Sequence, residues 1–248
     1  MKNKRHDSSY LAATPAGALS WGQLTPGVLL KRHKRFLAEV ELADGRLVTA
    51  HTANTGRMTG CSEPGRPVWL SHHPEPTRRL SYTWEMIEMP AALVGINTQV
   101  PNRLAALAAR AGLLAELDGP AEVETEVKIG ASRLDLRLTD QNGRPVLVEV
   151  KNSTLAEGGT AYFPDAVTAR GARHLDELTA RARAGERTAL LIVVQRDDAE
   201  RFSPADHIDP EWGRRLRIAL DQGVEVWVYR AEVTLMSVAL GPRLPLAL

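Results

Sequence analysis

Two carboxylates and one lysine, Asp135, Glu149 and Lys151, have the types and spacing that could do chemistry in this chain. Carboxylates directly opposite each other on paired β-strands lie about 5 Å apart and repel by roughly 3 kcal/mol at an effective dielectric near 20. A divalent cation between them would turn this repulsion into a binding site for a hard, oxygen-preferring metal such as Mg²⁺. Lys151, two residues beyond Glu149 on the same strand face, would lie beside whatever the metal binds. The alternative is a solvated strand face on which Arg133 and Lys151 balance the two acids, and the hairpin alone leaves it open.

The register of the predicted hairpin decides whether the two carboxylates meet. Residues 133–139 and 145–151 alternate apolar and polar side chains, as β-strands do. A two-residue turn would set Asp135 against a valine. A three-residue turn over 141–143 puts a glycine where a left-handed residue is favoured and pairs Asp135 with Glu149, so we predict this turn. The apolar face that it creates would consist of Leu134, Leu136, Leu138, Val146, Val148 and Val150.

The composition is that of an ordinary soluble globular protein, with 248 residues of which 44% are hydrophobic and 25% charged. The net charge is only +1, so any affinity for nucleic acid must come from local patches. A single cysteine, Cys61, excludes an internal disulfide and fits a reducing compartment, and no apolar run reaches membrane-spanning length. We expect a cytoplasmic protein without a membrane partner, with a disordered tail over residues 1–20. The sequence leaves open whether it forms a homodimer.

The turn-rich stretch over residues 21–97 predicts a small closed β-barrel of OB-like type. It contains short strand-like segments and no long amphipathic helix. The expected strands are 23–30, 36–42, 46–52, 68–71, 82–88 and 92–96. Asp44-Gly45 would join the second and third of them in a hairpin, and Trp69 and Trp84 are expected in the barrel core.

A basic run followed by an aromatic residue lies inside the predicted barrel. Lys31, Arg32, Lys34 and Arg35 supply four fixed positive charges immediately before Phe36. This combination suits a phosphate backbone with one stacked base. The alternative is a solvated turn, which is what short basic runs usually form.

A glycine-spaced loop over residues 54–60 could cradle a phosphate or a sugar through its backbone N–H groups. It lacks the lysine and serine that end a P-loop, so the motif alone is not specific. Arg57 of this loop is a candidate DNA contact. A zinc site is rejected, because the spacing of the possible ligands matches no zinc motif and one thiol is too few. The residues considered for it are His51, Cys61, His72 and His73.

Residues 98–248 have a different pattern, which predicts an α/β sheet of order αβββαβαβ with the acidic hairpin at its centre. The expected boundaries are an Asn102 cap and Gly112 for the first helix, 122–130 for a polar strand, Ala184 for the end of the second helix, 188–195 for a buried strand, Asp209 to Gly223 for the third helix and 224–229 for the last strand. Arg170 lies on one stripe of the second helix with His174 and Arg181, where the arginines could contact DNA phosphates. Charged residues on a helix exterior are the alternative.

Short blocks of sequence, all in one order, carry a resemblance to a known family. In the first half they are Lys34-Arg35-Phe36-Leu37-Ala38, His51, Asn54-Thr55-Gly56, Met58, Pro64-Gly65, Val68-Trp69 and Thr83-Trp84-Glu85. In the second half they are Glu126-Val127-Lys128, Ser132-Arg133-Leu134-Asp135, Glu149-Val150-Lys151, Tyr162-Phe163-Pro164-Asp165-Ala166-Val167, Arg170-Gly171, Arg201-Phe202-Ser203-Pro204 and Asp209-Pro210. With these blocks the chain resembles the sugar fermentation stimulation protein family over nearly its whole length after the tail.

The resemblance implies a DNA-binding protein linked to sugar utilisation, with an OB-like N-terminal domain and a PD-(D/E)XK nuclease-like C-terminal domain. Nucleases of that type carry an Asp on one strand and Glu-x-Lys on the next, which matches Asp135, Glu149 and Lys151. The chain departs from the family at Asn152, where a serine is expected, and in a longer tail. Cleavage does not follow from the fold, because nuclease-like folds can keep a site and serve only for binding.

Two functions are consistent with these residues. The leading hypothesis is a metal-dependent DNA-processing protein, in which Asp135, Glu149 and the Val150 carbonyl hold Mg²⁺ or Mn²⁺. Lys151 would orient water or stabilise charge on the phosphoryl oxygens. The alternative is a non-enzymatic DNA-binding regulator of sugar (maltose-type) metabolism with a structural acidic pair. The candidate DNA contacts are Lys31, Arg32, Lys34, Arg35, Phe36, Arg57, Arg133 and Arg170.

Overall fold

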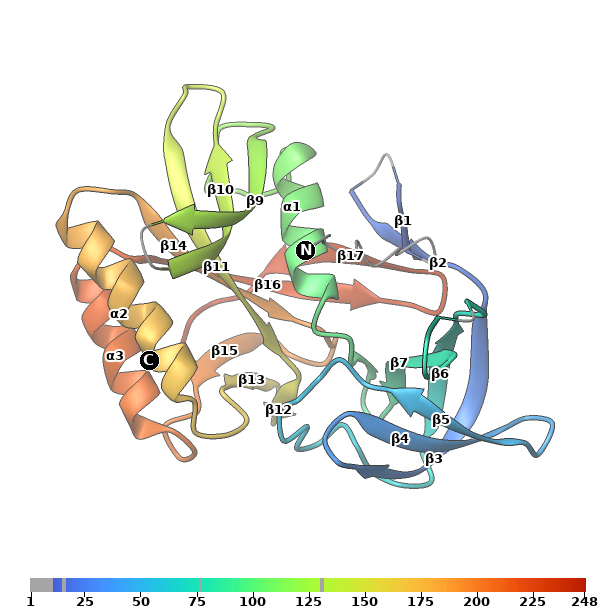
Figure 1. Cartoon of the computed structure of the whole chain (residues 1–248). Coiled ribbons are helices and arrows are strands. Elements are labelled where there is room, and N and C mark those ends of the chain that lie inside the picture. Colours follow the sequence, from blue (N-terminus) through green and yellow to red (C-terminus); the bar gives the residue numbers. More distant parts are fainter. Residues whose placement is uncertain (1–10, 15–16, 76, 130–131) are drawn as a thin grey trace.

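A computed structural model describes residues 11–14, 17–75, 77–129 and 132–248 of the chain. It has a mixed α/β fold with two units side by side, a β-barrel and a larger α/β unit (Figure 1). We call them the barrel and the sheet unit. The site described below lies where they meet.

The barrel forms because its strands alternate inward apolar with outward polar side chains. Its strands are β3 (Leu24–His33), β4 (Leu37–Leu42), β5 (Leu47–His51), β6 (Pro67–His72), β7 (Tyr82–Glu88) and β8 (Leu93–Gly95). They are ordered β5-β4-β3-β6-β7-β8, and a further pairing of β5 with β7 closes β3 to β7 into a barrel. Leu29, Val40, Leu70 and Trp84 are fully buried inside it. The predicted OB-like barrel is therefore confirmed.

Apolar side chains on the outside of the barrel pack against the sheet unit. Trp84 lies in the barrel core as expected, but Trp69 is only partly buried and packs on a core cluster of the sheet unit. Met86, the ladder partner of Trp69 on β7, is fully buried in the same cluster. The expectation for Trp69 is wrong because strand alternation turns it outward, between the inward-facing Val68 and Leu70.

The sheet unit is built on an 8-stranded sheet in the order β1-β2-β17-β16-β14-β11-β10-β9. Its strands are β1 (Leu11–Ala13), β2 (Leu19–Trp21), β9 (Glu122–Ile129), β10 (Ser132–Thr139), β11 (Pro145–Ser153), β14 (Thr188–Val194), β16 (Glu225–Val233) and β17 (Ser237–Arg243). A small second sheet contains β12 (Leu155–Glu157), β13 (Thr160–Phe163) and β15 (Arg201–Pro204). The parallel strand β14 is buried along its full length, as expected for a central strand covered on both faces.

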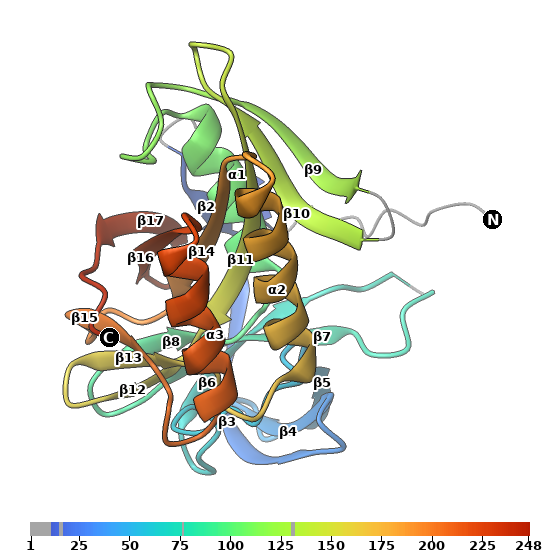
Figure 2. The ribbon, with the colours of Figure 1, turned by 90° about the vertical axis from the view of Figure 1, so that its left-hand side faces the viewer.

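The helices α1 (Val100–Arg110), α2 (Ala169–Arg183) and α3 (Pro210–Asp221) cover the two faces of this sheet. Figure 2 shows α2 and α3 side by side on one face, where Leu175 and Trp212 enter the core. On the opposite face, α1 contributes Leu104 to a second core cluster. Within the described ranges, no helix is both long and apolar enough to cross a membrane.

The predicted order αβββαβαβ is confirmed by α1, β9, β10, β11, α2, β14, α3 and β16, to which β12, β13, β15 and β17 are added. At the start of α3 the Asp209 side chain accepts from the Trp212 N–H over 3.0 Å, as predicted for a cap. Asn102 is not a cap. The first helix begins at Val100 because Pro101 is tolerated in the first turn, where its missing N–H would have no helical partner.

The prediction of a disordered tail over residues 1–20 is wrong for the part of it that the structure describes. Leu11, Leu19 and Trp21 are buried, and their strands β1 and β2 extend the large sheet beyond β17. The indole Nε1 of Trp21 donates to the Thr234 carbonyl over 3.0 Å. Burial of these apolar residues on an open sheet edge explains the order. Residues 1–10, 15 and 16 lie outside the described residues.

Candidate metal centre between the barrel and the sheet unit

The β10–β11 hairpin has the predicted register. Its ladder runs from the pair Thr139 and Pro145 to the pair Leu136 and Val148, and Asp135 and Glu149 follow directly after its last pair. Gly143 lies in the turn with a left-handed φ of 72°. The three-residue turn and the register from Leu136 to Thr139 are thus as predicted, and the direct pairing of Asp135 with Glu149 stays a prediction.

The predicted single apolar face is interrupted at Asp135. Leu136 and Leu138 face the α1 side of the sheet with the valines of β11, but Leu134 is buried in the core on the α2 side. The change occurs beside Glu126, the β9 residue between the partners of Leu134 and Leu136, which has a left-handed φ of 57°. The prediction that Leu134 shares the face is wrong, because this irregular backbone breaks the two-residue period.

Asp135 is held by two donors. Its Oδ1 accepts from Asn102 Nδ2 of α1, and its Oδ2 accepts from the Val150 N–H of β11, each over 2.8 Å. Burial raises the pKa of Asp135, and the charge of Glu149 raises it further. A carboxylate in this position is one whose ionised form a cation would stabilise. Asn102 was missed as a site residue because its helical position gives no sign of this contact.

Glu149 is the most buried member of the predicted site, with 3% of its side chain exposed. Its Oε1 contacts the Lys151 ammonium and His174 Nδ1. Its Oε2 is buried and has no hydrogen-bond partner among the described residues. Burial would raise the pKa of Glu149, but the hydrogen bonds from His174 and Lys151 outweigh it and lower the pKa. Glu149 therefore presents an anionic oxygen without a donor.

His174, which was predicted only as part of a charged helix stripe, belongs to this site, because its Nδ1 contacts Glu149 Oε1. Arg170 Nε donates to His174 Nε2 over 3.3 Å, and an arginine can only donate. A carboxylate oxygen can only accept, so the ring proton lies on Nδ1 and is donated to Glu149, with Lys151 Nζ 3.3 Å from the same nitrogen. The spacing of four residues that puts Arg170 and His174 on one side of α2 was visible in the sequence, but the packing of α2 on β11 was not.

The donor set fits a hard divalent cation. Asp135 and Glu149 supply carboxylate oxygens beside the Val150 backbone, and Glu149 Oε2 is an orphaned buried acceptor. In the described part of the chain, no cluster of three or more His, Cys, Asp and Glu side chains could hold a metal. Two carboxylates with a backbone carbonyl leave coordination positions for water and substrate, the usual arrangement for Mg²⁺. Cys61 lies apart in the barrel core, where burial raises the pKa of its thiol to about 11.

A cavity of about 340 Å³ lies between the barrel and the sheet unit, and its lining includes Val150 and Lys151, the residues that follow Glu149 on β11. The predicted residues Val150, Lys151 and Arg170 line it from the sheet unit. The other lining residues are Asn54, Thr55, Gly56, Thr98, Asn102, Asn152, Ser153, Thr154, Leu155, Tyr162, Phe163 and Asp165. The structure thus brings Arg170 to the predicted metal ligands.

The glycine-spaced loop of the barrel forms one wall of this cavity. The Met58 N–H donates to Asp165 Oδ2 over 2.8 Å, which joins the loop to the sheet unit. Gly56 is required there, because a Cβ at this position would come within 2.8 Å of the same oxygen. Arg57 is exposed beside it. The loop therefore reaches the candidate centre, although its sequence alone did not indicate which residues it would face.

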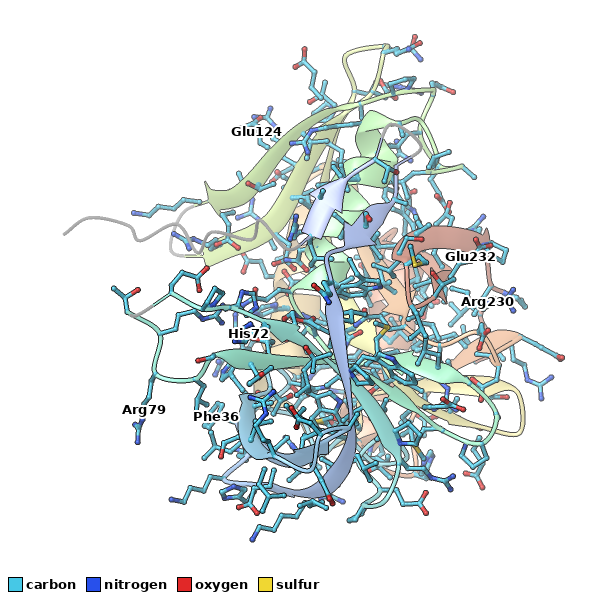
Figure 3. All side chains as sticks on the ribbon, turned by 90° about the vertical axis from the view of Figure 1, so that its right-hand side faces the viewer. Phe36, His72, Arg79, Glu124, Arg230 and Glu232 are labelled. Carbon is cyan, nitrogen blue, oxygen red and sulfur yellow. The ribbon has the colours of Figure 1, made fainter. Side chains whose placement is uncertain are left out.

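The basic run divides into one structural arginine and several exposed groups. Arg32 Nη2 lies 2.9, 3.0 and 2.9 Å from the carbonyl oxygens of Arg35, Asn54 and Gly56, which share its two N–H groups. Lys31 pairs with Glu39 over 3.2 Å. The exposed members Lys34, Arg35 and Phe36 lie at the β3–β4 turn, and Figure 3 shows Phe36 on the barrel. Arg133 lies apart from the cavity, in an exposed pair with Glu126 over 2.7 Å.

Arg32→Ala should lower the free energy of unfolding by about 1.5–3 kcal/mol, the usual scale for hydrogen bonds to a charged group. The reason is that one guanidinium joins the β3–β4 turn to the carbonyls of Asn54 and Gly56. Urea titration measures this loss. Arg35→Ala is the matched control and should change stability by less than about 0.5 kcal/mol, because its side chain is exposed. Equal losses in the two variants would contradict the structural role of Arg32.

Comparison with known proteins covers both units. A family model described as the SfsA N-terminal OB domain matches residues 30–96, and one described as the sugar fermentation stimulation protein RE domain matches residues 99–237. The solved structure of Pyrococcus furiosus SfsA in complex with Ca²⁺ is similar, with a TM-score of 0.84 and 28% identity over 92% of this chain and 98% of that one.

Curated relatives agree with the family models. A sugar fermentation stimulation protein homolog of Geobacter metallireducens is 50% identical over 227 residues, which cover 91% of this chain and 97% of the relative. A homolog of the same name from Pelobacter propionicus is 50% identical over 226 residues, 91% of this chain and 98% of the relative. The chain therefore belongs to the sugar fermentation stimulation protein family.

Proposed function

We propose that this protein binds DNA and hydrolyses its phosphodiesters with the help of a divalent cation. The observation that carries the proposal is the buried, unpartnered Oε2 of Glu149 next to a cavity lined by Lys151 and Arg170. A carboxylate oxygen without a donor suits a cation, and two positive side chains suit a phosphate. The Ca²⁺ complex of the Pyrococcus furiosus relative supports a divalent cation in the family.

In this proposal the residues of the centre have separate roles. Asp135, Glu149 and the Val150 carbonyl would hold Mg²⁺ or Mn²⁺, which polarises a phosphate and lowers the pKa of water. Asn102 keeps Asp135 in place, and His174 keeps Glu149 in place. Those contacts fix the carboxylates without covering Glu149 Oε2.

Two positively charged side chains of the cavity, Lys151 and Arg170, would contact the substrate. Lys151, whose side chain is 14% exposed, would donate to a phosphoryl oxygen as negative charge develops on it. Arg170, exposed at the start of α2, would contact a neighbouring phosphate. Its bond to His174 links phosphate binding to the orientation of Glu149.

The exposed turn of the barrel would hold the DNA backbone. Replacing Lys34 and Arg35 together by Gln should flatten the dependence of log affinity on log salt by up to about 1.8, since each lost phosphate contact removes about 0.9. Phe36→Ala should weaken single strands more than duplex, because it removes stacking and no charge. The matched control is Arg214→Gln with Arg215→Gln on α3, where both arginines pair with Glu211.

Fluorescence anisotropy at several salt concentrations measures these slopes. The control should keep the wild-type slope. An unchanged slope in the double variant of the turn would move the DNA surface away from the β3–β4 hairpin.

A non-enzymatic DNA-binding regulator of sugar metabolism is the second candidate. The observation that favours it is that Lys151 and His174 already contact Glu149, so the charge of this carboxylate is neutralised without a metal. Incubation of the pure protein with labelled DNA in Mg²⁺, in Mn²⁺ and in chelator separates the two. Cleavage by the wild type that stops in chelator supports the nuclease. Binding without cleavage in either metal supports the regulator.

A further inference from the structure

Asn152 has a fixed amide orientation at the wall of the inter-unit cavity. Gln195 Nε2 donates to the Asn97 carbonyl over 3.2 Å and to Asn152 Oδ1 over 2.8 Å. A backbone carbonyl only accepts, so the Gln195 atom that faces it must be nitrogen. That nitrogen needs an acceptor on Asn152, which turns the Asn152 oxygen towards Gln195. The Asn152 amide nitrogen is left for the cavity that the residue lines.

A buried network from the barrel fixes this orientation. Asn97 Nδ2 donates to Glu85 Oε2 over 2.9 Å, and the Ser71 hydroxyl donates to Glu85 Oε1 over 2.6 Å. The Gly95 N–H donates to the Gln195 carbonyl over 2.9 Å. A Cβ at Gly95 would come within 2.7 Å of Gln195 Oε1, so Gly95 makes room for the Gln195 side chain. The amide of Asn152 is thus oriented from the other unit.

The network contains one buried acceptor without a hydrogen-bond donor in the part of the chain that the structure describes, which costs stability and which packing alone does not explain. Gln195 is fully buried, and its Oε1 has no hydrogen-bond partner among the described residues. An apolar side chain of this size would leave no orphaned oxygen, so the amide at this place calls for a role beyond stability. Donating at once to Asn97 and Asn152 is a role that only the amide nitrogen supplies.

Tyr162 adds an aromatic ring to the same cavity. Its backbone carbonyl accepts from the Ser153 hydroxyl over 2.8 Å, next to Asn152 in the chain. Its ring meets His207 edge to face, with centroids 5.3 Å apart and planes at 89°. The side chain is half-buried and lines the cavity, so it offers an aromatic surface beside the Asn152 amide.

These groups suit a nucleobase and not a second phosphate. A phosphate matches cations, which Lys151 and Arg170 supply, whereas an aromatic ring and a neutral amide match the face and the edge of a base. A cavity of about 340 Å³ is of the size that takes a small organic group. A base stacked inside a duplex cannot enter it, so the base must be unpaired or turned out of the helix.

We propose that the cavity receives one unpaired base of the substrate strand, with Asn152 donating to its edge and Tyr162 contacting its face. Gln195 is a positioning residue that acts through Asn152. This inference rests on the proposed DNA binding and names strands with unpaired bases as the substrate class.

The test compares two single strands of equal length and charge, one of thymidine residues and one abasic throughout. Their affinities are measured by fluorescence anisotropy in chelator, so that no cleavage interferes. We expect the wild type to prefer the thymidine strand by roughly tenfold, within the usual range for stacking one base. Asn152→Leu and Tyr162→Leu should each reduce this preference several-fold and leave the affinity for the abasic strand unchanged. Gln141→Met, on the β10–β11 turn outside the cavity, is the control and should keep the preference.

Gln195→Met tests the positioning role, with a melting curve to confirm that the variant folds. It should reduce the preference as Asn152→Leu does, and the two changes combined should lose no more than either alone, because they act through one contact. A merely structural role for Gln195 would instead weaken both strands and add to the loss in Asn152→Leu. That additive result would overturn its assignment.

The outcomes separate this inference from the proposed function. The base site is overturned, while DNA binding stands, if the wild type has equal affinity for both strands. The same conclusion follows if Asn152→Leu and Tyr162→Leu weaken the affinity for the two strands equally. Failure of the wild type to bind any strand overturns both. A base preference that depends on Asn152, without cleavage in any metal, supports the base site and contradicts the proposed nuclease activity.

Discussion

Lys151→Ala should slow metal-dependent DNA cleavage by roughly a hundredfold or more, the scale on which one electrostatic stabiliser of a transition state acts. The ammonium contacts Glu149 Oε1 and lines the cavity where a phosphate would bind. Folding should be nearly unaffected, because His174 still donates to the same Glu149 oxygen when Lys151 is lost. Lys151→Arg should not restore the rate, since a planar guanidinium cannot replace a compact ammonium in a confined site.

The measurement is the loss of intact labelled DNA in Mg²⁺ or Mn²⁺ by wild type and both variants at matched purity. Lys128→Ala, an exposed lysine on β9, is the control and should cleave like wild type. DNA affinity in chelator should stay within about twofold in all of them, because one contact among several phosphate contacts is lost. If wild type and Lys151→Ala degrade DNA equally fast, the activity comes from a contaminant or from another site.

Asp135→Asn should abolish the stabilisation that a divalent cation gives to the wild type. A cation present at a hundredfold excess over its dissociation constant adds about 2.7 kcal/mol, or about 5–10 °C in melting temperature for a chain of this size. The metal-free variant should be as stable as wild type or slightly more so, because burial and the nearby Glu149 already raise the pKa of Asp135. Asn102 can turn its amide to remain hydrogen-bonded to the new side chain.

Melting curves with and without Mg²⁺, Mn²⁺ and Ca²⁺ measure this difference. Glu124→Gln is the matched control, since Glu124 is an exposed carboxylate on β9 (Figure 3) and does not line the cavity. It should keep the full gain. A gain in Asp135→Asn as large as that of wild type would show that the cation binds elsewhere.

Local patterns of the sequence predicted the parts of the fold that local physics controls. Alternation and Gly143 determine the hairpin and its register, and Asp209 caps its helix through a neighbouring N–H. These features depend on residues close in the chain, so their signals survive in the sequence. The hairpin that brings Asp135 and Glu149 near each other could therefore be predicted from the sequence.

The residues that complete the centre could not be predicted, because they arrive by tertiary packing. Asn102 and His174 reach the carboxylates from α1 and α2, and nothing in the spacing of a helix states which strand it will cover. The same is true of Arg32, whose charge indicated a phosphate contact while its donors are used on backbone carbonyls. The predicted face of Leu134 was wrong for a different reason, because the alternation of apolar and polar residues does not reveal the left-handed backbone at Glu126.

The pairing of β2 with β17 has a consequence for covalent connectivity. The described chain leaves the sheet unit after Trp21 of β2 to build the barrel, and it returns after Gly95 to start α1 (Figure 1). The barrel is therefore inserted into the sheet unit and joined to it by two chain connections, and it is not a separate terminal domain. A single proteolytic nick in one of these connections would leave the units joined by the other connection and by the hydrogen bonds from Met58 to Asp165 and from Gly95 to Gln195.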